Sequence, residues 1–167
     1  MAEEANLTDA HILIVDDDAA IRDSMNEFVQ MSGFSASTAA CAEDALEMLQ
    51  SNMVDVVITD ILLPGMDGLE LTDRIRKNFE VDVIVMTGYS GDYSYEEAIS
   101  KGASDFVFKP VRFEELLLRL RRVLKERRLT QERIQMLEKL KRLSITDGLT
   151  KLYNSRYFYN QLKIEID

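Results

Sequence analysis

The stretch that decides the fold is ILIVDDD at residues 12–18, in which four apolar residues lead directly into three aspartates. Two later stretches, VVITD at residues 56–60 and VIVMT at residues 83–87, also end an apolar run on a polar residue. Short apolar runs of this kind are typical of strands that are covered by helices on both faces. These three runs therefore predict the centre of a parallel β-sheet.

Outward from these runs, short apolar stretches alternate with stretches that carry apolar residues at helical spacing. We predict five strands, at residues 11–15, 34–38, 54–59, 81–86 and 105–108. Helices are predicted between them, at residues 19–31, 42–51, 68–78 and 94–101. Asp18 and Asp67 can cap two of these helices, and Gly33 and Gly102 stand where helix-ending glycines are common. The predicted fold class is α/β, a parallel sheet with helices on both faces.

The composition excludes several classes of function. The 167 residues include one cysteine, Cys41, and one histidine, His11, so no disulfide within the chain and no zinc or iron-sulfur site is expected. No apolar run approaches the ~18 residues of a membrane span. Residues 1–6 have neither the basic nor the apolar part of a secretory signal. We therefore expect a cytoplasmic protein that does not enter a membrane.

Charge divides the chain into parts. Of its 30 acids and 20 bases, residues 1–110 hold 22 acids and 6 bases, whereas residues 111–143 hold 5 acids and 11 bases. The acidic part argues against binding of nucleic acid by the first unit. We predict three parts: a domain at residues 1–125, a helical linker at 126–143 and a short C-terminal segment at 144–167.

Polar side chains gather at the predicted carboxyl ends of the strands. Asp16 and Asp17 follow the first strand, Asp60 follows the third, Thr87 closes the fourth and Lys109 closes the fifth. Singly, each has an ordinary structural explanation as a turn former, helix cap or surface residue. Their coincidence at the edge where parallel sheets place their sites favours function. Three crowded carboxylates favour a hard cation such as Mg²⁺, which leaves one carboxylate free to act as a nucleophile.

These residues also carry a resemblance. The stretches at residues 12–18, 59–68 (TDILLPGMDG), 86–88 (MTG) and 108–110 (FKP) resemble, in order and spacing, the receiver domain of two-component response regulators, over about residues 10–125. The resemblance implies a doubly wound, flavodoxin-like sheet of order 2-1-3-4-5. The residues that follow it predict an extended C-terminal helix. It also implies a histidine kinase as phosphodonor and Mg²⁺ as cofactor.

By this resemblance, Asp60 looks like the phosphoacceptor, Asp17 like a direct metal ligand and Asp16 like a ligand through water. The backbone carbonyl of Leu62 would complete the protein's share of the coordination. Leu62 and Tyr89 stand two residues beyond Asp60 and Thr87. They predict slow loss of the phosphoryl group, because a leucine cannot orient a water and a tyrosine can shield the phosphoryl group from attack.

The same resemblance assigns the switch. Thr87 and Lys109 would hold the phosphoryl oxygens, with Gly88 leaving space beside them. The switch aromatic falls on Phe106, three residues before the lysine, and it lacks the hydroxyl of the commoner tyrosine. A cis bond is implied between Lys109 and Pro110.

The linker is predicted to be one continuous helix, since residues 111–143 contain neither glycine nor proline. Leucines and a valine at residues 116–124 can cover the sheet or a neighbouring receiver. Beyond them, Leu129, Met136, Leu140 and Leu143 form a heptad-like stripe, which predicts a parallel coiled coil and hence a homodimer through this helix and the receiver face. Residues 127, 131 and 134 fit a competing register. A solvated basic helix without a partner is the simpler alternative.

Residues 144–158 (SITDGLTKLYNSRYF) resemble the entry segment of diguanylate cyclase domains of the GGDEF family, with departures at Lys151 and Ser155. The cyclase signature itself is absent from the sequence, so this chain alone is not expected to make cyclic di-GMP from GTP. We expect the receiver to control such an output in a longer parent protein. One alternative is an Asp-nucleophile phosphatase, which the Ile61-Leu62 sequence after Asp60 disfavours. Another is a receiver that controls a nucleic-acid-binding or other dimeric output. Nucleic-acid binding is not expected, because acidic residues are interspersed among the bases of the helix.

Overall fold

The structure is a computed structural model that describes residues 7–88 and 95–166, with the backbone alone described from residue 145 onward. Its sheet has five parallel strands in the order β2-β1-β3-β4-β5. The strands are β1 (His11–Val15), β2 (Ser35–Ala39), β3 (Val56–Asp60), β4 (Asp82–Thr87) and β5 (Asp105–Phe108). The predicted doubly wound fold is confirmed.

Two of the helices begin directly after the capping residues that the sequence predicts. The helices are α2 (Ala19–Met31), α3 (Ala42–Ser51), α4 (Gly68–Asn78), α5 (Tyr95–Ser100) and α6 (Phe113–Ile166). Asp18 accepts the backbone N–H groups of Ala20 and Ile21 at the start of α2, and Asp67 accepts the N–H of Glu70 at the start of α4. Gly33 and Gly102 have φ angles of 97° and 99°, which favour glycine.

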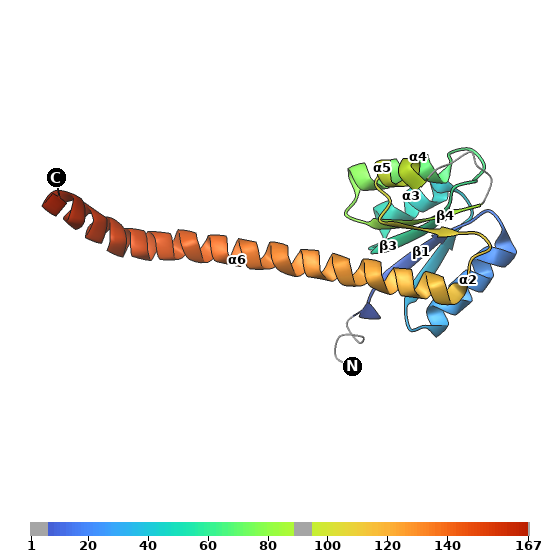
Figure 1. Ribbon diagram of the computed structural model, residues 1–167, viewed down its shortest axis with the longest axis horizontal. Helices are drawn as coiled ribbons and strands as arrows, with labels where there is room; N and C mark the ends of the chain where they lie inside the picture. Colours follow the sequence, from blue (N-terminus) through green and yellow to red (C-terminus); the bar gives the residue numbers. More distant parts are fainter. Residues whose placement is uncertain (1–6, 89–94, 167) are drawn as a thin grey trace. The chain divides into compact units, whose positions relative to one another are not determined.

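The helices cover the sheet on both faces (Figure 1). On one face, α3, α4 and α5 pack on alternate strand residues such as Leu13 and Val57. On the other face, α2 and the first turns of α6 pack on Ile12 and Ile58. Both sides of β1, β3 and β4 are therefore buried, which explains why their sequences are apolar almost throughout.

Three strands begin later than predicted. Phe34, Val54 and Val81 were expected to open strands, and each is buried, but the ladders begin at Ser35, Val56 and Asp82. The apolar side chains mark burial, whereas the strand is defined by backbone pairing. The strands correspondingly run one residue further, so that Asp60 is the last residue of β3 rather than its neighbour, and Thr87 closes β4 as expected.

Helix α6 differs most from its predicted bounds. It was expected over residues 111–143 but runs from Phe113 to Ile166. No proline interrupts residues 144–166, and a single glycine costs a helix only about 1 kcal/mol. The chain forms two compact units, residues 1–126 and 127–167. Within the described residues, no helix has a stretch both long and apolar enough to cross a bilayer.

Candidate functional site

The parallel sheet brings together the polar residues that end its strands. Asp16 follows β1, Asp60 ends β3, Thr87 ends β4 and Lys109 follows β5. Because β1, β3, β4 and β5 run in the same direction and are neighbours in the sheet, these residues lie along one edge. This is the edge at which open α/β sheets hold their ligands.

Three carboxylates form the centre of this edge. One oxygen from each of Asp16, Asp17 and Asp60 lies within 4.8 Å of the others. Asp16 is fully buried and Asp60 nearly so, while Asp17 is exposed to solvent. Hard carboxylate oxygens at one partly open point suit a small divalent cation that keeps several of its waters, so the donor set fits magnesium.

Lys109 joins two of these carboxylates. Its Nζ donates to Asp60 Oδ2 at 2.7 Å and to Asp16 Oδ2 at 3.3 Å. Burial alone would lower the pKa of the Lys109 ammonium, but hydrogen bonding and attraction to Asp60, together with Asp16, raise its pKa above the usual value. The Lys109 ammonium is therefore a fixed positive charge that faces the carboxylates of the site. The peptide bond from Lys109 to Pro110 is cis, as the resemblance implied.

Asp16 is held firmly within the β1–α2 loop. Its Oδ1 accepts the backbone N–H of Asp18 at 2.9 Å, and its own N–H donates to the carbonyl of Ala39 at 3.2 Å. Burial raises the pKa of the Asp16 carboxyl and nearby Asp60 adds to the rise, while the Asp18 N–H and Lys109 oppose it. The negative charge of a buried carboxylate in such surroundings is better compensated when a further cation is bound nearby.

The loop after Asp60 packs closely against the start of α4. The N–H of Leu62 donates to Asp60 Oδ1 at 3.2 Å, so both oxygens of that carboxylate are engaged, whereas 59% of Leu62 is exposed. The N–H of Gly68 donates to the carbonyl of Ile61 at 2.8 Å. A Cβ added at Gly68 would meet the Asp60 carbonyl oxygen at 2.0 Å, so only glycine fits here.

The two predicted switch residues lie on neighbouring strands. Thr87 is buried and its hydroxyl donates to the carbonyl of Gly88 at 3.2 Å. Phe106 is half-buried beside Val85, and its ring lies 4.5 Å from Tyr95 and 5.1 Å from Phe108 between centroids. The other residue predicted to control the phosphoryl lifetime, Tyr89, lies outside the described residues.

One charged group near the switch was not predicted. Asp105 in β5 is buried, and its carboxylate binds Arg119 at 2.9 Å and Arg122 at 3.1 Å, both from α6. The Arg119 guanidinium also lies 5.7 Å from the centre of the Phe106 ring. The sequence does contain a signal for this contact, because an aspartate opens an otherwise apolar strand. A carboxylate buried in this way needs a cationic partner.

Comparison with known proteins identifies the family. The response regulator receiver domain matches residues 12–121. The chain is 35% identical over 114 residues to the transcriptional regulatory protein AfsQ1 of Streptomyces coelicolor, covering 68% of this chain and 51% of that protein. It is 36% identical over 132 residues to a cyclic di-GMP phosphodiesterase of Thermotoga maritima, covering 78% of this chain and 35% of that protein.

A solved structure agrees with these sequence matches. The receiver domain of NtrX from Brucella abortus is 35% identical, with a TM-score of 0.64, and the match covers 68% of this chain and 98% of that one. The chain spans about half or less of the length of the two curated relatives named above. Those relatives carry names with different outputs, so the shared part is the receiver.

Proposed function

The chain belongs to the response regulator receiver family, and from this membership we propose that Asp60 accepts a phosphoryl group from a histidine kinase or a small phosphodonor. A carboxylate oxygen of Asp60 attacks phosphorus, and the bond from phosphorus to the donor atom breaks, with its electron pair leaving on the donor. The product is an aspartyl phosphate. The proposal is carried by one observation, the cluster of Asp16, Asp17 and Asp60 with Lys109 seated on two of them.

Magnesium is the proposed cofactor. The carboxylates of Asp16, Asp17 and Asp60 and the backbone carbonyl of Leu62 would hold the ion. When bound, it neutralises negative charge that accumulates as a phosphoryl group approaches a carboxylate. Thr87 and Lys109 are proposed to hold the phosphoryl oxygens, through the hydroxyl and the ammonium respectively.

We propose that Lys109 couples phosphorylation to the switch. In Lys109→Ala, magnesium binding should be kept or tightened, because the lysine is not a ligand of the metal and its ammonium competes for the carboxylates of Asp60 and Asp16. The phosphorylated variant should fail to change its oligomeric state, because no ammonium then draws the phosphoryl group toward β5. Light scattering before and after treatment with acetyl phosphate measures this.

The matched control for Lys109→Ala is Lys101→Ala, which removes an exposed lysine at the end of α5. The control should respond to phosphorylation like the unmodified chain. Full dimerisation of phosphorylated Lys109→Ala would show that the lysine does not transmit the signal.

The phosphorylated state should be long-lived, because the exposed Leu62 side chain next to the site offers no polar group to orient a water. Leu62→Asn should therefore speed the loss of phosphate, and adding Tyr89→Glu should speed it further. Loss of acid-labile phosphate over time in magnesium buffer measures the rate. The control is Met53→Asn, which changes another exposed side chain. If the Leu62 and Tyr89 substitutions left the rate of phosphate loss unchanged, other residues would control the lifetime of the phosphorylated state.

The proposed consequence of phosphorylation is a changed homodimer. Phe106 would turn toward Thr87 and alter how the receiver face and α6 meet a second copy. Support comes from apolar side chains of α6 that are exposed in the single chain: Leu129 41%, Met136 67%, Leu140 57% and Leu143 53%. An apolar stripe at this spacing needs a partner helix to bury it.

We propose that a cytoplasmic parent protein uses this dimer to control a diguanylate cyclase, on the basis of residues 144–158. The side chains of residues 145–158 lie outside the described residues. The second candidate is a transcriptional output, favoured by the name of AfsQ1 and by the basic residues of α6. Assay of the full-length parent for GTP turnover with and without acetyl phosphate distinguishes them. Phosphorylation-dependent formation of cyclic di-GMP supports the first, and salt-sensitive, sequence-specific DNA binding without turnover supports the second.

A further inference from the structure

We propose that Arg22 is a positioning residue of the metal site, which holds the β1–α2 loop so that Asp16 and Asp17 face a common cation. This inference rests on the proposed function of the site. Arg22 is the only lysine or arginine among residues 1–73. Its Nη1 donates to the backbone carbonyl of Asp16 at 2.8 Å.

The carbonyl that Arg22 holds belongs to the peptide group between Asp16 and Asp17. A peptide group is planar, so fixing its oxygen also fixes the direction of the Asp17 N–H and restricts the turn into Asp17. The Asp16 side chain has its own anchors, the Asp18 N–H and Lys109. Asp17 is exposed, and the orientation of its carboxylate therefore depends on the backbone that Arg22 holds.

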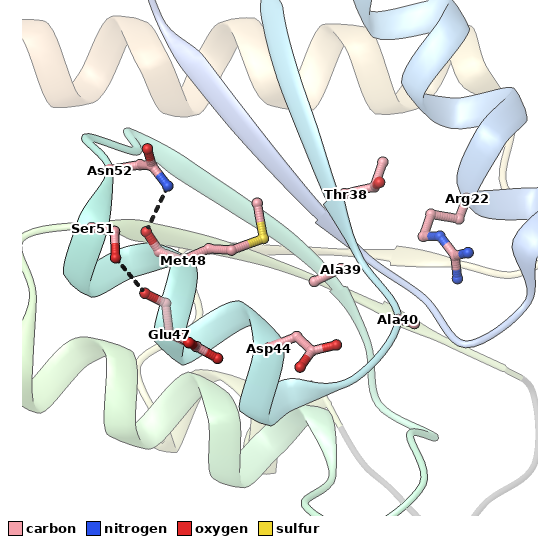
Figure 2. A pocket seen from close by; sticks show the side chains of 9 residues that line it. All are labelled: Arg22, Thr38, Ala39, Ala40, Asp44, Glu47, Met48, Ser51 and Asn52. Carbon is pink, nitrogen blue, oxygen red and sulfur yellow. Dashed lines mark hydrogen bonds between the residues drawn. The ribbon is translucent and has the colours of Figure 1, made fainter.

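Arg22 belongs to α2 and stands beside the end of β2, whereas Lys109 follows β5 at the opposite edge of the sheet. It lines a cavity of about 540 Å³ between α2, the end of β2 and α3. Figure 2 shows Arg22 on one side of this cavity, with Asp44 and Glu47 of α3 on another. Arg22 thus lines a pocket together with acidic residues of α3, and its guanidinium donates to a backbone carbonyl of the metal-site loop.

Charge and position predict opposite effects for loss of this side chain. A cation beside Asp16 disfavours a second cation at the same carboxylates, so removing Arg22 should tighten magnesium binding if only its charge matters. If Arg22 positions the loop, its removal should weaken magnesium binding, by roughly ten-fold, as is typical for residues that orient metal ligands. The sign of the change separates the two roles.

The experiment is titration calorimetry of the full chain with magnesium chloride, comparing Arg22→Met with Arg74→Met. Arg74 forms an exposed pair with Glu70 on α4, so its loss changes the net charge equally and leaves the loop alone. We expect Arg22→Met to bind magnesium about ten-fold more weakly than Arg74→Met. Without metal, amide hydrogen exchange at Asp17 and Asp18 should be faster in Arg22→Met, with exchange in α4 unchanged.

Arg22→Lys keeps the charge and one donor and should bind magnesium more tightly than Arg22→Met. It also serves if the methionine variant does not fold. Affinity in Arg22→Met equal to or tighter than in Arg74→Met would overturn the positioning role, as would a lysine variant no better than the methionine variant. Absence of magnesium binding by the unmodified chain would instead overturn the proposed metal site, so the two failures are distinguishable.

Discussion

Replacing Asp60 by asparagine is expected to abolish phosphorylation by acetyl phosphate or a histidine kinase. An amide keeps the shape of the side chain and can still accept the Leu62 N–H, but it is not a nucleophile toward phosphorus. Chelating magnesium with EDTA should likewise stop phosphorylation of the unmodified chain, because the negative charge of the approaching groups is then not neutralised. Incorporation of phosphate is followed by intact-protein mass spectrometry.

The control for Asp60→Asn is Asp23→Asn, an exposed aspartate of α2 that should be phosphorylated at the normal rate on Asp60. Phosphorylation of Asp60→Asn at a rate comparable to that control would remove Asp60 from the reaction. Undiminished phosphorylation in EDTA would remove the metal from it.

The second large effect is expected at Gly68. In Gly68→Ala the new Cβ would meet the Asp60 carbonyl oxygen at 2.0 Å and the Ile61 Cα at 2.8 Å. Both are backbone atoms, so no side-chain rotation relieves the overlap, and α4 must move away from the end of β3. We expect a loss of about 3 kcal/mol in the free energy of unfolding, measured with urea, together with slower phosphorylation of the folded protein.

Gly33→Ala separates the two consequences. Gly33 has a positive φ, and its Cβ would meet the Thr8 side chain at 3.2 Å and no backbone atom, so a loss of about 1 kcal/mol is expected without a change in phosphorylation. If Gly68→Ala were as stable and as reactive as the unmodified chain, the close approach of α4 to Asp60 would not matter.

The sequence predicted helix boundaries better than strand boundaries. Helix starts are set by local chemistry, as with Asp18 and Asp67, whose side chains accept the first free N–H groups. Strand ends depend on pairing with distant residues, so Val54 and Val81 look like strand residues but serve only to fill the core. The predicted end of α6 was also wrong, because the residues after Leu143 carry no strong signal that ends a helix.

The carboxylate cluster could be predicted because parallel strands bring their carboxyl ends to one edge. The partners of these residues could not. Nothing in the local sequence states that Arg22 reaches back six positions to the Asp16 carbonyl, or that Asp105 collects two arginines from α6. Such contacts depend on where a long side chain ends in three dimensions, which periodicity does not encode.

The most direct test of the central claim is to locate the phosphoryl group chemically. The chain is treated with acetyl phosphate and magnesium, and the acyl phosphate is reduced with borohydride, which converts a phosphorylated aspartate into homoserine. Peptide mass spectrometry then reads the position. We predict homoserine at residue 60, formed only when magnesium is present. Homoserine at residue 16 or 17 instead, or none at residue 60 under conditions that phosphorylate a known receiver, would contradict the account.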